Sequence, residues 1–482
     1  MKTYIKTTLI LLIALSLSSC KGFLDVTPSD QGSSTTSMLT LQDATYTVNG
    51  MYTIMKYSDY YGTNMLIMGE TRADDMRPRV YNSGWWAIHS FDMSPYSNNY
   101  FSIWNRCYNV IMRANAIIEG WDQIPNTDMA AKNDILGQAY AVRAICYFDL
   151  AKMYGYPYAK DNGGSLGVPL VTHTFDKPAD AKIARSTVAQ TYQQALSDLE
   201  TALPLLSKSR RSDRFGYWSA KLLQARIYLY MGNWDAAYNA SVEVINNSPH
   251  TLVARADYLT YWRKADVPET MLELLVTANS GSDNNVGIDT WFHSLWHLGS
   301  NPSGTLVLTT PFVKLFENDP NDIRRDFIRY DSNVQAGVPW LAKYPGNETA
   351  SSHAVNNIKV LRLTEAYLIA AETGLRTGKA DAKSYLDAIK KRANTNANLS
   401  YTLTEDEILT ERRKEFIGEG HRFFDMMRLG KTINRNYDGN VLINSETHQI
   451  TWNYHRVVLP ISATEIILWG GSILQQNPGY PN

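Results

Sequence analysis

The sequence predicts a mostly α-helical protein, in which a scaffold of repeated helix pairs carries long ordered loop insertions. Three observations predict this class. Apolar residues recur at three- and four-residue spacing through much of the chain. Two later pairs of helical patterns each meet at a Gly, and long irregular segments rich in aromatic residues separate the helical blocks. Of the 482 residues, 44% are hydrophobic and 19% are charged, which is typical of globular proteins.

The N-terminus has the parts of a bacterial lipoprotein signal peptide. Two lysines precede an apolar stretch from Leu9 to Leu17, about half of the ~20 residues that a membrane-spanning helix needs. Two serines and Cys20 follow this stretch, where an ordinary secretory signal would have an Ala-x-Ala-like site. We therefore expect residues 1–19 to be removed and Cys20 to be diacylated. Residues 20–40, rich in Ser and Thr, are predicted to form the lipidated N-terminus and tether.

Residues 41–482 are predicted to form a single body. The spacing of apolar residues predicts helices within 41–55, 100–118 and 135–153. Two further helix starts show the spacing of a capping box, Thr187 with Gln190 and Thr404 with Glu407. Cys107 and Cys146 both fall within helical patterns, which favours two buried thiols over a disulfide bond.

A weak internal repeat joins two later helix pairs. The helical patterns 217–231 and 234–247 meet at Gly232, and the patterns 358–376 and 380–394 meet at Gly378. In each pair Gly ends the first helix, and a small Ala lets the second helix pack closely. This arrangement is typical of tetratricopeptide-like repeats, and two unrelated helical hairpins are the alternative interpretation.

Irregular segments lie at 58–98, 155–183, 248–357 and 430–460. Loops this long are usually functional or disordered, and their aromatic content argues against disorder. The chain has 30 Tyr and 12 Trp. Rings in the loops either attach the loops to the body or offer flat apolar faces to a ligand such as a sugar. For the adjacent pair Trp85-Trp86 we expect at least one exposed ring, because neighbouring side chains on an extended segment point to opposite faces.

Charge and motif content exclude several classes of function. A formal net charge of -1 offers no basic field for nucleic acid. The chain lacks Gly-x-Ser-x-Gly, His-Glu-x-x-His and Gly-x-Gly-x-x-Gly motifs, so we predict that it is not an enzyme and binds no cofactor or metal. Glu70, Asp74 and Asp75 have the side chains of a glycosidase carboxylate pair. Acidic residues beside several arginines more often form a salt-bridged loop.

The C-terminal third carries the most specific motif. The run from Glu411 to Arg428 reads ERRKEFIGEGHRFFDMMR, and the tail runs from Leu459 to Tyr480. Together with the segment that begins at Cys20, these motifs resemble the SusD/RagB family. Charges in the run recur at three- and four-residue spacing, which favours an ion-pair network that locks the last helices together. The motifs therefore indicate the fold and not a binding site.

This resemblance implies a SusD-like outer-membrane lipoprotein, anchored by lipid and facing the cell exterior. Such a protein captures an oligosaccharide or polysaccharide and delivers it to a SusC-like TonB-dependent transporter. Loop insertions, mainly 58–98 and 248–357, would hold the ligand. On this chain the predicted ligand-binding residues are Arg77, Tyr81, Asn82, Trp85, Trp86, Trp291 and Trp296. A RagB-like peptide-capture protein of the same fold and a purely protein-binding scaffold remain as alternatives.

Overall fold

The computed structural model describes residues 39–79, 85–97, 102–175, 182–277, 306–330, 336–348, 355–436 and 447–481. Helices dominate these ranges, and none of them is long and apolar enough to cross a membrane. The helices are α2 (Leu41–Met55), α3 (Asn64–Thr71), α4 (Trp86–His89), α5 (Ser102–Gly120), α6 (Met129–Tyr154), α7 (Val188–Ala202), α8 (Tyr217–Met231), α9 (Trp234–Asn247), α10 (Tyr258–Tyr261), α12 (Thr310–Lys314), α13 (Leu363–Arg376), α14 (Ala382–Ala393), α15 (Glu405–Phe416), α16 (Arg422–Arg428) and α17 (Ala463–Trp469).

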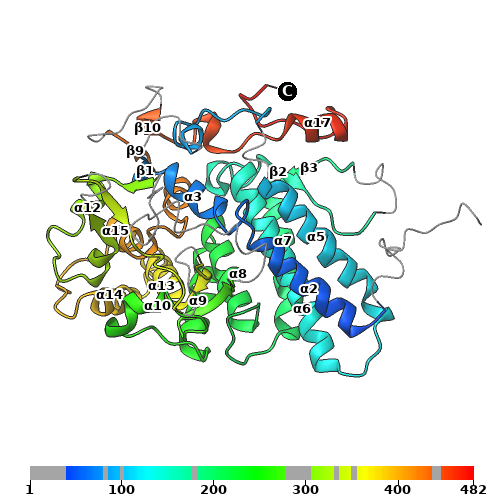
Figure 1. Cartoon of the computed structure of the whole chain (residues 1–482), viewed down its shortest axis with the longest axis horizontal. Coiled ribbons are helices and arrows are strands. Elements are labelled where there is room, and N and C mark those ends of the chain that lie inside the picture. The colour runs from blue at the N-terminus through cyan, green and yellow to red at the C-terminus, as the bar shows by residue number, and fades with distance from the viewer. Residues whose placement is uncertain are drawn as a thin grey trace, which may run out of the picture.

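Helices packed against their neighbours form the scaffold (Figure 1). Helix α2 packs on α5, and the series then continues through α6, α7, α8 and α9. Helix α13 packs on α9 and α14 on α13, although about 115 residues of chain separate α9 from α13. The two helix pairs that the sequence predicts to be repeats are therefore neighbours in one array. Figure 1 shows this array below α3 and α17.

In both repeat pairs a Gly ends the first helix, as the sequence predicts. Gly232 has φ 72° at the end of α8, and Gly378 has φ 68° between α13 and α14. Only Gly adopts this left-handed conformation without strain, so each Gly ends its first helix. A methyl group at Gly374 would lie 2.8 Å from Cβ of Ala382, which shows how closely α14 packs on α13. For this pair, the predicted role of a small residue in the second helix is confirmed.

Short antiparallel pairs of strands connect the helical blocks. The pairs are β1 (Met76–Pro78) with β5 (Leu306–Leu308), β2 (Leu166–Pro169) with β3 (Arg185–Thr187), β4 (Thr270–Leu274) with β8 (Ile358–Arg362), β6 (Ile328–Tyr330) with β7 (Pro339–Leu341), and β9 (Ile433–Asn434) with β10 (Gln449–Ile450).

Two sequence predictions of local structure are wrong. Residues 358–362 were expected to begin a helix, but they form β8, which pairs with β4 and is fully buried. This pairing satisfies the backbone and suits the β-branched side chains of Ile358 and Val360. Segment 58–98 was expected to be irregular, yet it contains α3. Every residue of α3 is buried, so its sequence lacks the one-sided apolar pattern that would reveal a helix.

Smaller predictions are confirmed. Cys107 and Cys146 are both buried, free thiols. The side chain of Thr187 accepts a hydrogen bond from the backbone of Gln190, and the Gln190 side chain returns one, as a capping box requires. At the start of α15 the Thr404 side chain accepts from the backbone of Glu407. These contacts are local, so the sequence alone predicts them.

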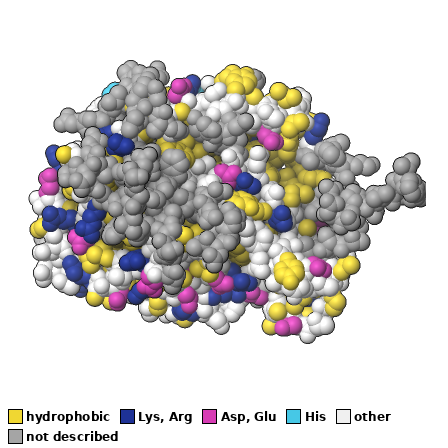
Figure 2. Space-filling view, viewed as in Figure 1, with side chains coloured by type: hydrophobic (Ala, Val, Ile, Leu, Met, Phe, Trp, Pro, Cys, Tyr) yellow, Lys and Arg dark blue, Asp and Glu magenta, His cyan; other side chains and the backbone are white. Residues whose placement is uncertain are grey.

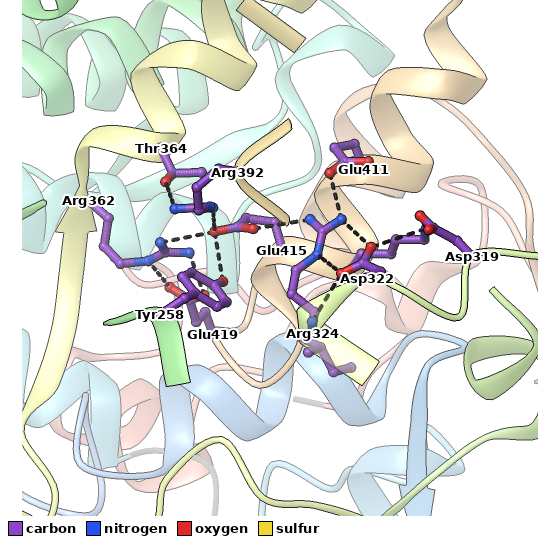
Figure 3. A network of polar contacts seen from close by, with 12 residues as sticks. Tyr258, Asp319, Asp322, Arg324, Arg362, Thr364, Arg392, Glu411, Glu415 and Glu419 are labelled. Carbon is purple, nitrogen blue, oxygen red and sulfur yellow. Dashed lines mark hydrogen bonds and ion pairs between the residues drawn. The ribbon is translucent and has the colours of Figure 1, made fainter. Parts of the chain in front are cut away.

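The charged run 411–428 forms a buried ion-pair network, as predicted, but most of its partners are distant in the sequence. Figure 3 shows Arg324, Arg362 and Arg392 converging on the Glu415 carboxylate. Their closest approaches to Glu415 are 3.1, 3.2 and 2.6 Å respectively, and the Glu415 side chain is fully buried. Because those arginines come from three different segments, the run attaches α15 to the scaffold as well as to its neighbouring helices.

Helix α3 and the Gly-rich turn of this run approach each other backbone to backbone. A methyl group added to Gly69 would lie 2.0 Å from the carbonyl oxygen of Gly420. We predict that Gly69→Ala lowers the free energy of unfolding by about 1–3 kcal/mol, because neither backbone can move aside freely. Gly50→Ala in α2 is the matched control, since its nearest neighbour is an Arg113 side-chain atom at 3.5 Å. Urea denaturation of both variants would contradict the prediction if Gly69→Ala were as stable as Gly50→Ala.

Candidate ligand-binding site

The two loops that the sequence analysis selects begin and end beside each other. Strand β1 pairs with β5 so that Pro78 lies opposite Leu306 and Met76 opposite Leu308. The chain leaves β1 at Pro78 towards residues 79–84, and it enters β5 at Leu306 from residues 278–305. Pro78 and Leu306, from which these segments continue, therefore lie at the same end of one strand pair. Figure 1 shows β1 beside α3, at the left of the molecule.

An arginine and a tryptophan lie together at this end of the strands. The guanidinium carbon of Arg79 is 5.5 Å from the ring centre of Trp340, within the range of a cation–π contact. Trp340 belongs to β7, which lies against β5, and its side chain is fully buried. Its indole Nε1 has no hydrogen-bond acceptor among the described residues. Arg79 is half-buried.

The C-terminal charged run holds β1 in place. The Arg422 guanidinium donates two hydrogen bonds to the Asp74 carboxylate, at 2.8 and 3.0 Å. Arg413 pairs in the same way with Asp75. Burial opposes the charged form of Asp74, but the two guanidinium groups outweigh it and keep the pKa of Asp74 below its ordinary value. The turn that precedes β1 is thus fixed by residues about 340 positions away.

The same run also fixes the segment that follows β7. Lys343 is fully buried, and its ammonium group donates to Glu419 Oε1 at 2.6 Å and to the carbonyl oxygens of Glu415 and Ile417. Because β7 ends at Leu341, these bonds position the Trp340 strand relative to α15. Residues 411–428 therefore form a C-terminal clamp, which holds the turn before β1 and the segment after β7 in place. This structural role agrees with the prediction that the motif indicates the fold.

Glu70 lies under the site as a buried carboxyl group. Its Oε1 accepts a hydrogen bond of 2.7 Å from the backbone of Gly420, and its Oε2 has no partner among the described residues. Burial, followed by the negative charge of Asp75, raises the pKa of Glu70 to about 8. Glu70 is therefore mainly protonated at neutral pH.

The predicted site residues fall into three groups. Trp85 and Trp86 are only 9% and 6% exposed, so the expectation that one ring is exposed is wrong. Trp85 caps the short helix α4 and Trp86 begins it, so the pair does not lie on an extended segment. Arg77 lies in β1 and is half-buried, with its Nη1 donating to the Pro78 carbonyl oxygen at 3.1 Å. The remaining predicted residues lie outside the described ranges, and they are Cys20, Tyr81, Asn82, Trp291 and Trp296.

Sequence reasoning missed the pairing of Arg79 with Trp340. Arg79 comes one residue after β1, beside acidic residues that favour a salt bridge. The signal available in the sequence was the alternation of Arg77 and Arg79 around Pro78. Nothing local links Arg79 to Trp340, because 260 residues separate them.

The acidic residues of this region are structural. Glu70 and Asp75 are at most 1% exposed, and Asp74 is paired with Arg422, so none presents a free carboxylate to a substrate. The interpretation as a salt-bridged loop is confirmed for Asp74 and Asp75 only, and their partners are Arg422 and Arg413 of the C-terminal run, not the neighbouring arginines. Within the described residues, no cluster of three or more His, Cys, Asp or Glu side chains could hold a metal ion.

Comparisons with known proteins establish the family. Residues 22–229 match the family model described as "Starch-binding associating with outer membrane", and residues 322–480 match that of the SusD family. A SusD superfamily protein from Bacteroides thetaiotaomicron is 31% identical, with a TM-score of 0.84 over 91% of this chain and 100% of that chain. The chain belongs to the SusD family.

Further SusD-family relatives match along most of the chain. A SusD superfamily protein from Bacteroides vulgatus is 32% identical, with a TM-score of 0.82 over 92% of this chain and 100% of that chain. "SusD-like protein P25" from Formosa agariphila is 25% identical, over 87% of this chain and 88% of the relative. The SusD-like fold predicted from the sequence is confirmed. The matching family model is described as starch-binding, so the family is one of carbohydrate-binding proteins.

Proposed function

We propose that this SusD-family protein captures an oligosaccharide at the outer surface of the cell and passes it to a SusC-like TonB-dependent transporter. The observation that supports the proposal is the β1–β5 pairing, in which Pro78, the last residue of β1, lies opposite Leu306, the first residue of β5. The anchor predicted at Cys20 would hold the protein at the membrane. Transfer to a transporter follows from the family resemblance.

The relatives suggest a class of sugar to test. "Starch-binding protein SusD" from Bacteroides thetaiotaomicron is 36% identical over 150 residues, which is 30% of this chain. Surface glycan-binding protein A from the same species was solved in complex with laminarihexaose. It has the same fold, with a TM-score of 0.74 at 22% identity. Maltohexaose and laminarihexaose are therefore the first probes.

The Arg79–Trp340 pair offers the chemistry that such a ligand needs. A guanidinium group is planar and carries its N–H groups in one plane, so it can donate to neighbouring sugar hydroxyls. Trp340 and the Lys343 bonds behind it hold this plane in a fixed position. The ligand thus meets a donor that is already ordered, which reduces the entropy lost on binding.

We predict that Arg79→Ala weakens the binding of the best hexasaccharide at least tenfold, or about 1.4 kcal/mol, because it removes charge-assisted hydrogen bonds. Isothermal titration of the purified mature protein measures this effect. Arg325→Ala, an exposed arginine in the short 3₁₀ helix Ile323–Phe327 that precedes β6, is the matched control. Equal affinity of the two variants would contradict the assignment of Arg79.

Two other results would contradict the proposed function itself. Binding of mixed oligopeptides with no retardation by any glycan in affinity electrophoresis would support peptide capture. Recovery of a TonB-dependent transporter with the protein, but no glycan or peptide binding, would support a purely protein-binding scaffold.

A further inference from the structure

A second, open groove lies away from β1, between α5 and the C-terminal helix α17. It encloses about 690 Å³, and its apolar lining includes Trp104, Tyr108, Met112, Phe175 and Trp469. Figure 2 shows hydrophobic side chains gathered in a hollow at the place where Figure 1 draws α5 below α17. The volume is within the range of about 300–1,000 Å³ found for small-molecule sites.

The floor of the groove is built from one face of α5. Trp104, Tyr108 and Met112 are spaced four residues apart, so they follow one another along the helix. The Trp104 and Tyr108 rings have centres 4.9 Å apart, and the Tyr108 hydroxyl donates to the Pro169 carbonyl oxygen at 2.8 Å. These contacts hold the aromatic floor in one arrangement before any ligand arrives.

The wall of the groove comes from α17. Trp469 follows Glu465 by four residues, so the two side chains lie on the same face of the helix, and both line the groove. Trp469 is half-buried, unlike the fully packed core rings, and it lies opposite the α5 floor in the same groove.

A polar compartment of about 470 Å³ continues from the aromatic one. The two compartments share Asn105 and Glu465, and Ser102 and Thr464 add hydroxyl groups to the second. Asn105 is exposed, and its side chain makes no hydrogen bond within the described parts of the chain. One continuous groove thus offers aromatic faces in one half and hydrogen-bonding groups in the other.

The charges of the groove balance. Its two arginines are Arg106, paired with Asp59 at 2.9 Å, and Arg113, whose Nε donates to Asn109 Oδ1 at 2.9 Å. Its two acidic residues are Asp59 and Glu465. Two positive and two negative side chains give no net charge, so the groove favours a neutral ligand over an anionic or cationic one.

We propose that this groove is a second saccharide-binding site, which takes a neutral oligosaccharide and is separate from the loop site at β1. The apolar C–H faces of a sugar ring would pack on Tyr108 and Trp469. Hydroxyl groups of the next ring would meet Asn105 and Glu465 in the polar half. A purely apolar partner would leave these polar groups without hydrogen bonds, which is costly. This inference goes beyond the capture of glycan by the loops and does not depend on it.

A blocking experiment on the folded mature protein tests the second site. Asn109 is exposed at the edge of the groove, Cys107 and Cys146 are buried, and the predicted lipid occupies the thiol of Cys20. Asn109→Cys can therefore be labelled selectively with a bulky maleimide. Isothermal titration with laminarihexaose, maltohexaose and cellohexaose then compares the same variant before and after labelling. We expect labelling to weaken one binding event at least tenfold. Glu200→Cys, exposed on α7, is the matched control, and its labelling should change nothing.

Combining the block with Arg79→Ala separates this site from the loop site. If both sites bind, each change removes a different binding event. If the loop site binds no sugar, Arg79→Ala has no effect while the groove block abolishes binding, which leaves the groove proposal intact and defeats the loop proposal. The groove proposal is overturned if labelled Asn109→Cys titrates like the unlabelled variant. It is also overturned if labelling only prevents recovery of a transporter with the protein, because the groove would then be a protein contact.

Discussion

Glu415→Gln is expected to lower the free energy of unfolding by about 3–5 kcal/mol, the usual cost of removing one partner from a buried ion pair. The Glu415 carboxylate accepts hydrogen bonds from Arg324, Arg362 and Arg392, and also from the Tyr258 hydroxyl at 3.0 Å. Glutamine has nearly the same shape, but its amide nitrogen cannot accept a hydrogen bond and it carries no charge. Three buried guanidinium groups would then lose their shared counter-charge. Urea denaturation at neutral pH measures the loss.

The control for Glu415→Gln is an exposed ion pair in the same part of the chain. Asp406 pairs with Lys431 at 2.9 Å, but its side chain is 85% exposed. Asp406→Asn should cost less than about 1 kcal/mol, because water screens the pair. If Glu415→Gln were as stable as Asp406→Asn, the buried network would not be what secures α15.

Acid should weaken the same network. Burial opposes the charged form of Glu415, but Arg392, Arg362 and Arg324 outweigh it and hold its pKa well below the ordinary range. A carboxyl group whose pKa is lowered by folding contributes stability that is present above its unfolded pKa of about 4.3. That contribution is lost as the pH falls below this value. The difference in stability between the wild type and Glu415→Gln should therefore shrink in acid.

Glu70→Gln should have the opposite pH dependence. The pKa of Glu70 is raised to about 8 in the folded protein, from an unfolded value of about 4.3. Between these values the folded state holds a proton that the unfolded state has lost, so the stability of the wild type falls as the pH rises. A neutral glutamine removes this dependence. Relative to the wild type, the variant should gain on the order of 3 kcal/mol between pH 5 and pH 8.

Denaturation at several pH values tests this effect. Glu200→Gln on the exposed surface of α7 is the matched control, and its stability should run parallel to that of the wild type. A Glu70→Gln curve that also runs parallel to the wild type would show that Glu70 is ionised in the folded protein. The result bears on the site, because Glu70 and Gly420 connect α3 with the C-terminal clamp beneath β1.

Much of the scaffold could be predicted from the sequence. Helices α2, α8 and α9 have the predicted bounds, because amphipathic spacing, capping side chains and a terminal Gly are local features. For α3 and β8 this local pattern is absent, and the sequence did not predict these elements correctly. Helix α3 is buried on all sides, and β8 gains its conformation from pairing with β4, a strand more than 80 residues earlier.

The candidate site could be predicted only in part. The sequence selected the loops around Trp85 and around Trp291–Trp296 from their aromatic content. It could not show that β1 and β5 bring the ends of those loops together, or that Trp85 and Trp86 are buried. Arg79 with Trp340, and the groove between α5 and α17, join residues that are hundreds of positions apart.

By itself, the sequence determined the helical class, the corners of the repeats and the family motif. Each depends on residues within a few positions of one another, where spacing and backbone preference act directly. Only the tertiary structure decided which residues form ion pairs with the charged side chains of residues 411–428. The spacing of residues 411–428 favours contacts among themselves, yet Arg413, Arg422 and Glu415 pair mainly with residues far along the chain. Burying a charge is costly unless a counter-charge lies beside it, and the fold, not the distance along the sequence, decides which counter-charge lies close.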